Sequence, residues 1–129
     1  GLSLRGHPME VVRRDLARLG VVRASALVDG SSLPSGRVVD VAGVVLIRQR
    51  PGTASGIVFV TLEDETGVAN LIVRPGVFER FRAVARHATV LRARGLVERE
   101  GKVVHVQVRW MEDWTDRALR PASRSRDFH

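Results

Sequence analysis

The sequence predicts an all-β fold with one inserted helix: a five-stranded barrel preceded by a short amphipathic helix and followed by a loose polar tail. Two observations lead to this prediction. Between residues 37 and 113, short apolar segments alternate with polar positions, and turn-forming residues separate the segments. A single helical pattern interrupts this region, with three strand patterns before it and two after it.

The composition indicates a single domain of 129 residues with a polyanionic partner. Lysine and arginine number 21 against 14 acidic residues, which gives a net charge of +7, and every basic residue except Lys102 is arginine. This surplus favours nucleic acid over neutral metabolites or acidic proteins as the partner, although a GC-rich genome also enriches a protein in arginine. Cysteine is absent, which excludes disulfides, thiolate zinc sites and cysteine nucleophiles.

No stretch of the chain has the character of a membrane or export segment. No apolar run approaches the roughly 20 residues of a membrane span, and the first residues do not have the pattern of a signal peptide. We therefore expect a cytoplasmic protein that contacts no membrane. The chain begins with Gly1 instead of methionine, so a cloning residue and a cut within a longer protein are both open interpretations.

Residues 1–36 are predicted to form a helical connector. Pro8 suits the first turn of a helix, and Gly20 suits its end. Four apolar residues between them recur at helical spacing: Met9, Val12, Leu16 and Leu19. Residues 29–36 are rich in glycine and serine and are expected to form a linker to the next domain.

Residues 37–113 are predicted to form the barrel, beginning with three strands. The first strand covers residues 38–48, and its central Gly43 indicates a sharp bend in a strand that serves two sheets. The second and third strands cover residues 57–63 and 68–73 and flank a tight turn. A loop rich in glycine separates the first strand from the second.

A helix and a hairpin complete the barrel. Pro75 opens the helix, whose predicted apolar stripe contains Val77, Phe78, Phe81, Val84 and Ala85. The hairpin pairs residues 89–98 with residues 102–111 around a turn at Glu100-Gly101. Three strands, a helix and two further strands are the layout of the OB fold, which binds oligonucleotides on its second and third strands and the adjoining loops. Residues 114–129 are polar and are predicted to form a flexible tail.

Alternation along the hairpin predicts a basic outer wall. Arg92 and Arg94 alternate with apolar residues on its first strand, so both should point outward. His105, Gln107 and Arg109 should point outward on its second strand. With the predicted turn, Arg92 lies opposite Arg109, and like charges at such a position are unfavourable unless an anion lies between them. A nucleic-acid site and a solvated arginine-rich wall both remain open interpretations.

The second and third strands should also present residues to solvent. Alternation places Phe59 and Thr61 outside on the second strand and Asn70 outside on the third. A phenylalanine on the outer wall of a barrel either packs beneath an appendage, here the N-terminal helix, or stacks on a base. Asn70 either reads the edge of a base or binds a neighbouring loop.

Basic residues in the loops occur where the OB fold holds its ligand. Arg48 and Arg50 precede the glycine-containing loop between the first two strands, and Lys102 lies at the final hairpin. The candidate nucleic-acid-binding residues are Arg48, Arg50, Phe59, Thr61, Asn70, Arg74, Arg92, Arg94, Lys102, His105, Gln107 and Arg109.

Nothing in the sequence indicates catalysis by this segment. Glu63, Asp64 and Glu65 form the one cluster of carboxylates, and its position at a strand end fits turn chemistry better than metal binding. The histidines are scattered, without the spacing of a zinc site, and no phosphate-binding glycine motif occurs. We expect no cofactor, no metal and no small-molecule substrate.

The central residues of the chain are similar to a known family. Residues 42–75 (AGVVLIRQRPGTASGIVFVTLEDETGVANLIVRP), together with residues 77–81, resemble the C-terminal OB region of bacterial DNA polymerase III alpha subunits. The resemblance is strongest to the error-prone, damage-inducible paralogue of that subunit, and residues 2–8 and 125–129 extend it to both ends of the chain. One departure is Arg74, where relatives often have tryptophan, so base stacking is not expected at that position.

The resemblance implies a role in mutagenic DNA synthesis. Polymerases of this family carry out translesion synthesis in the SOS response, alongside a catalytically inactive Y-family-like adaptor and accessory mutasome proteins, and their catalytic domains are not present here. The segment would hold single-stranded template DNA or dock a mutasome partner, the latter through Trp114 and Phe128 in the tail. RNA or tRNA binding, which the same barrel performs in synthetases, is a third interpretation.

Overall fold

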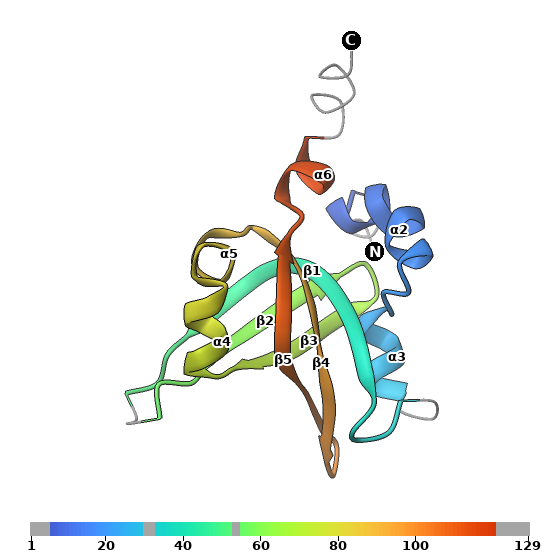
Figure 1. Cartoon of the computed structure of the whole chain (residues 1–129). Coiled ribbons are helices and arrows are strands. Elements are labelled where there is room, and N and C mark those ends of the chain that lie inside the picture. The colour runs from blue at the N-terminus through green and yellow to red at the C-terminus, as the bar shows by residue number, and fades with distance from the viewer. Residues whose placement is uncertain (1–5, 30–32, 53–54, 121–129) are drawn as a thin grey trace.

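Five strands close into a barrel in the computed structural model, which describes residues 6–29, 33–52 and 55–120 (Figure 1). The order around the barrel is β1-β2-β3-β5-β4. The strands are β1 (Val38–Gln49), β2 (Val58–Asp64), β3 (Gly67–Val73), β4 (Val90–Glu100) and β5 (Val103–Asp113). All pairs are antiparallel except β3 with β5, which are parallel and close the barrel. The predicted five-stranded OB fold is confirmed.

β1 belongs to both halves of the barrel, because it pairs with β4 through its first part and with β2 through its last part. Gly43 lies immediately before the change of partner. A Cβ atom at this position would lie 2.6 Å from the carbonyl oxygen of Glu63, so only glycine allows the two backbones to approach this closely. Glycine is therefore needed at position 43 because the backbones of β1 and β2 lie too close together there for a side chain.

Two short helices, α4 (Pro75–Arg80) and α5 (Arg82–His87), replace the single helix predicted between the third and fourth strands. The break is at Phe81, whose φ of −113° and ψ of 34° are not helical. Phe78 and Ala85 are buried against the barrel core, and Phe81 packs against it. The helices lie on the opposite side of the barrel from α2 and α3 (Figure 1).

The N-terminal helix α2 (Pro8–Arg18) packs on the outside of the barrel through Met9, Val12 and Leu16 of the predicted apolar stripe, while Leu19, its fourth predicted member, lies after the helix and is exposed. Helix α2 is followed by a second helix, α3 (Ala24–Asp29), which the sequence analysis did not predict. The stripe joins a second apolar core, separate from the barrel interior, that contains Met9, Val12, Leu16, Val21, Ala42, Val90, Trp114 and Ala118. No helix among the described residues has the length and apolar character needed to cross a membrane.

The prediction of a loose tail from Trp114 onward is wrong for residues 114–119. Trp114 is 2% exposed and belongs to the second core, and it is followed by the short helix α6 (Thr115–Leu119). Its indole Nε1 donates to Glu112 Oε1 at 2.7 Å, and the backbone N–H groups of Thr89 and Val90 donate to Thr115 Oγ1. Burial of one large aromatic ring therefore holds this segment on the barrel. Residues 121–129, including Phe128, lie outside the described residues.

The turn of the final hairpin lies one residue later than predicted, because Glu100 pairs with Val103. Gly101 has a φ of +61°, the conformation that a two-residue hairpin turn requires at its first position. We expect Gly101→Ala to lower the free energy of unfolding by about 1–2 kcal/mol, because a Cβ atom meets nothing within 4 Å there and the whole effect is conformational. Urea unfolding measures it.

A suitable comparison is Gly76→Ala in α4, where a Cβ atom also meets nothing within 4 Å and the backbone is helical. That change should leave stability unchanged or raise it slightly. Equal stability of the two variants would contradict the turn assignment.

Candidate nucleic-acid interface

A row of uncharged residues crosses the outer side of four strands. The strand registers place Gln49 next to Phe59, Phe59 next to Ile72, and Ile72 next to Gln107. A second row joins Ile47, Thr61 and Asn70 in the same way. The outer face is the set Ile47, Gln49, Phe59, Thr61, Asn70, Ile72, His105 and Gln107. His105 belongs to it because it lies two residues before Gln107 on the same side of β5.

The centre of the outer face is aromatic and open to solvent. Phe59 is 36% exposed, and the neighbouring Ile47 is 48% exposed. The Thr61 hydroxyl donates to Asn70 Oδ1 at 3.3 Å, so these two polar side chains lie beside the ring and remain accessible. The predicted outward direction of Phe59, Thr61 and Asn70 is therefore the observed one.

The N-terminal helix does not cover Phe59. The apolar stripe of α2 packs instead against Ala42 and Val90 in the second core, with Val44 beside them. The interpretation in which Phe59 packs beneath that helix is wrong. The helix instead packs on apolar side chains of β1 and β4. Phe59 is thus exposed and not covered by α2, and base stacking at this position stays a prediction.

Arg92 and Arg94 do not form a free basic wall, and this part of the prediction is wrong. Two shifts cause the difference: the turn lies one residue later, and a bulge interrupts the β4–β5 register between Arg94 and Gly95. Arg92 therefore lies opposite Glu112 instead of Arg109, and Arg94 lies opposite Trp110 instead of Gln107. Arg92 is 7% exposed, so it is not available to a ligand.

Asp40 on β1 forms ion pairs with both arginines. Its Oδ2 atom accepts from Arg92 Nη2 at 2.7 Å, and its Oδ1 atom accepts from Arg94 Nε at 2.7 Å. Burial raises the pKa of Asp40, but the hydrogen bonds from Arg94 and Arg92 outweigh it, and the net pKa lies below the ordinary value. Arg92 also contacts Glu112 Oε1 at 3.2 Å, and both guanidinium groups lie about 5 Å from the Trp110 ring centroid. We call these five residues the Asp40 network: Asp40, Arg92, Arg94, Trp110 and Glu112.

Sequence analysis missed Asp40, although one signal for it exists. Asp40 is the single charged residue in an otherwise apolar strand segment, and a carboxylate at such a position needs a partner. Which arginines supply the partner is decided by the pairing of β1 with β4, where Asp40 lies directly opposite Arg94.

Arg48 bonds to the protein's own backbone, while its predicted role in ligand binding stays a prediction. It lies within β1 opposite the core residue Val60, because a bulge after Val45 shifts the alternation of the strand. Its Nε donates to the carbonyl oxygen of Ala85 at 2.8 Å, and its Nη2 donates to that of Ala88. Arg48 thus binds carbonyl groups at the end of α5, and burial lowers its pKa.

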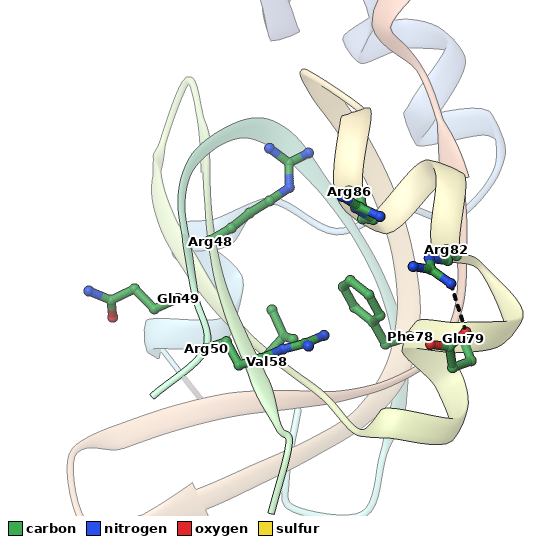
Figure 2. A pocket seen from close by; sticks show the side chains of 8 residues that line it. All are labelled: Arg48, Gln49, Arg50, Val58, Phe78, Glu79, Arg82 and Arg86. Atoms are coloured by element: carbon green, nitrogen blue, oxygen red, sulfur yellow. Dashed lines mark ion pairs between the residues drawn. The ribbon is translucent and has the colours of Figure 1, made fainter. Parts of the chain in front are cut away.

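Arg50 and two arginines of α5 surround an open groove of about 460 Å³ between the end of β1 and the helices (Figure 2). Its lining residues are Arg48, Gln49, Arg50, Val58, Phe78, Glu79, Arg82 and Arg86; we call it the arginine groove. Arg50 lies 4.8 Å above the centroid of the Phe78 ring. Sequence analysis selected Arg48 and Arg50 but missed Arg82 and Arg86, whose four-residue spacing places them on one helix face.

The remaining predicted residues lie at the margins of the outer face. Arg74 Nε donates to Gln107 Oε1 at 3.4 Å, and Gln107 Nε2 donates to Glu98 Oε1 at 3.0 Å. Lys102 lines a hollow with Val28 and Val103 next to β3. Arg109 is exposed and forms no salt bridge within the part of the chain that the structure describes.

The carboxylate cluster between β2 and β3 holds the helices in place. Asp64 accepts from the backbone N–H groups of Ala24, Thr66 and Gly67, which builds the turn and anchors the start of α3. Glu65 receives two hydrogen bonds from Arg13 of α2, and these lower its pKa. Across residues 6–29, 33–52 and 55–120, no group of three or more acidic or histidine side chains is placed to hold a metal ion.

Comparison with known proteins agrees with this geometry. Residues 35–113 match the family described as OB-fold nucleic acid binding domain. The chain is 55% identical over 131 aligned residues to the error-prone DNA polymerase of Anaeromyxobacter sp. (strain K), covering 100% of this chain and 11% of that protein. It is 46% identical over 129 residues to the error-prone DNA polymerase of Azoarcus sp. (strain BH72), covering 100% of this chain and 12% of that protein. The chain thus matches a small part of each relative, and the resemblance seen in the sequence is confirmed.

A solved structure supports the fold independently. The crystal structure of asparaginyl-tRNA synthetase from Pyrococcus horikoshii complexed with asparaginyl-adenylate superposes with a TM-score of 0.59. The superposition covers 74% of this chain and 22% of that chain at 22% identity. At this identity the likeness establishes the shared barrel and nothing about a shared ligand.

Proposed function

This chain belongs to the family of OB-fold nucleic-acid-binding domains, and on this premise we propose that it binds single-stranded DNA without sequence preference. The outer face is the proposed contact surface. One observation carries the proposal: Phe59 is exposed at the centre of this face, with Thr61 and Asn70 beside it. Aromatic rings stack on any base, so such a face binds a single strand and tolerates every sequence.

The proposed biological setting is damage-induced, translesion DNA synthesis. The similar proteins are error-prone DNA polymerases, and the present chain covers 11–12% of their length. A binding module of this kind would hold the single-stranded template near a catalytic centre located elsewhere in the polymerase. Such a polymerase would work with a Y-family-like adaptor and accessory mutasome proteins.

We expect the domain to bind a fluorescein-labelled single-stranded 20-mer with a Kd of about 10⁻⁴–10⁻⁶ M, and to lose affinity steeply as salt rises. The physical reason is that phosphate contacts release counterions, so log K falls linearly with log salt at about 0.7 per contact for single strands. Fluorescence anisotropy at 50 and 200 mM salt measures both quantities. Absence of binding at 50 mM salt would refute the proposal.

A second candidate function is docking of a mutasome partner, and one observation favours it. Val28, Val68 and Val103 are 74%, 43% and 51% exposed and line the same hollow beside β3. Exposed apolar side chains that gather in one place are typical of protein contacts. Of the anchors proposed from the sequence, Trp114 is buried in the second core, and Phe128 lies outside the described residues. Failure of the 20-mer to bind would favour this function.

A further inference from the structure

The cationic side chains of this domain lie beside the stacking surface instead of on it: Arg74, Lys102 and Arg109 lie at its margins, and four arginines gather in the arginine groove. The outer face consists of apolar, amide, hydroxyl and imidazole side chains, without an arginine or lysine among its eight members. The arginine groove contains four arginines and one carboxylate. A single strand has both bases and phosphates, so a surface that stacks bases needs cations nearby for the phosphates.

Two of the four groove cations, Arg48 and Arg50, are held in position by contacts within the protein. Arg50 stacks on the Phe78 ring, and a guanidinium group in that arrangement keeps its N–H groups free at the edge of the plane. Arg48 closes one end of the groove through its bonds to the carbonyl groups of Ala85 and Ala88. Figure 2 shows Arg82 and Arg86 above Phe78, on the side where α5 faces the groove.

Little negative charge balances these arginines. Glu79 is the one acidic residue of the lining, and it pairs with Arg82 at 3.6 Å through side chains that are 66% and 58% exposed. An ion pair this exposed is weak and can be replaced by another anion. Within the described part of the chain, Arg86 has no salt bridge. The groove is therefore a net cationic site.

The groove adjoins the outer face through β1 and β2. Gln49 belongs to both, since it pairs with Phe59 in the sheet and also lines the groove, where its side chain points away from the arginines (Figure 2). Val58, another lining residue, precedes Phe59 on β2. Val58 and Phe59 point to opposite sides of β2, so a single strand that stacks on Phe59 has to pass around the end of β1 to reach the groove.

We propose that the arginine groove is a separate phosphate-binding subsite, in which Arg50, Arg82 and Arg86 bind the backbone of the single strand that stacks on the outer face. This inference rests on the proposed function. An acidic peptide could also satisfy these arginines, but continuity with the outer face favours a nucleic-acid backbone, whose phosphates continue from the stacked bases.

The test compares two double variants with equal loss of charge. Arg82→Ala/Arg86→Ala removes the pair on α5, and Arg14→Ala/Arg18→Ala removes an exposed pair of the same spacing on α2, on the other side of the barrel (Figure 1). We expect the α5 variant to lower the salt slope for a dT20 oligonucleotide by about 1.4, corresponding to two phosphates, and to weaken binding about ten- to a hundredfold at 50 mM salt. The α2 variant should retain the slope of the unmodified domain.

The outcomes separate this inference from the proposed function. If the unmodified domain does not bind dT20, both are refuted. If it binds and the two double variants have equal slopes, the outer face binds DNA but the groove is not a subsite. If a deca-glutamate peptide binds in an Arg82- and Arg86-dependent manner while dT20 binding is unchanged in the α5 variant, the groove is a peptide site and the inference is overturned. The midpoint of thermal unfolding should be the same in the unmodified domain and in the two double variants.

Discussion

Replacing Asp40 by asparagine is expected to lower the free energy of unfolding by about 3–5 kcal/mol, because the change leaves Arg92 buried without its main counter-charge. Domains of this size have total stabilities of about 5–15 kcal/mol, so the loss is a large share. Glu112 still contacts Arg92 at 3.2 Å in the variant, which favours the lower end of the range. Urea unfolding followed by tryptophan fluorescence measures the loss, since Trp110 lies within the Asp40 network.

The same substitution should change how stability depends on pH. The pKa of Asp40 in the folded domain lies below its unfolded value, so its contribution is complete above about pH 5 and is lost as the pH falls through the unfolded and then the folded pKa. The difference in the free energy of unfolding between the unmodified domain and Asp40→Asn should therefore shrink as the pH falls across this acidic range.

A matched control is Glu79→Gln, which removes the carboxylate from an exposed ion pair between Glu79 of α4 and Arg82 of α5. An ion pair of this kind contributes at most about 1 kcal/mol. If Asp40→Asn costs no more than Glu79→Gln at neutral pH, the Asp40 network does not hold β1 and β4 together.

Phe59→Ala is expected to weaken binding of a single-stranded oligonucleotide by about 1–3 kcal/mol, which is roughly 5- to 150-fold in Kd. The reason is loss of the phenyl ring at the centre of the outer face, onto which a base can stack. Since stacking does not discriminate among bases, the loss should be similar for dT, dA and mixed sequences. Anisotropy titrations at 50 mM salt measure it.

Two further variants make the interpretation specific. Phe59→Tyr keeps an aromatic ring and should retain most of the affinity. Leu119→Ala removes a side chain of α6 that is 44% exposed and lies outside the proposed contact surface, so its Kd should not change. Retained affinity in Phe59→Ala would show that the outer face is not the stacking surface, whatever the arginine groove binds.

The salt dependence of these variants distinguishes the two surfaces. Phe59→Ala removes no charge, so it should lower affinity while leaving the salt slope unchanged. The α5 variant Arg82→Ala/Arg86→Ala should lower the slope as well as the affinity. A domain that binds through one surface only would not give this pair of results.

Most of the fold could be predicted because its signals are local. Successive side chains of a strand point to opposite faces, so the alternation in residues 57–63 predicted both the core residues and the exposed Phe59. Glycine and proline supplied the boundaries, with Pro75 at the first turn of α4 and Gly101 in the final turn. The helix α3 was missed because it has six residues, too few for a helical period to be distinguished.

The sequence by itself therefore determined the barrel, its strand order along the chain and the outward direction of Phe59, Thr61 and Asn70, since these depend on a period of two and on turn residues. The tertiary structure alone decided which arginines are free. Arg92 bonds to Asp40 across 52 positions of sequence, and Arg48 bonds to the end of α5. The pairing of β1 with β4 brings Asp40 to Arg92 and Arg94 and so changes a predicted ligand site into structural ion pairs, while a bulge of a single residue shifts which residues of β5 lie opposite them. Charge can be counted in a sequence, but its neutralisation depends on contacts that only the folded chain makes.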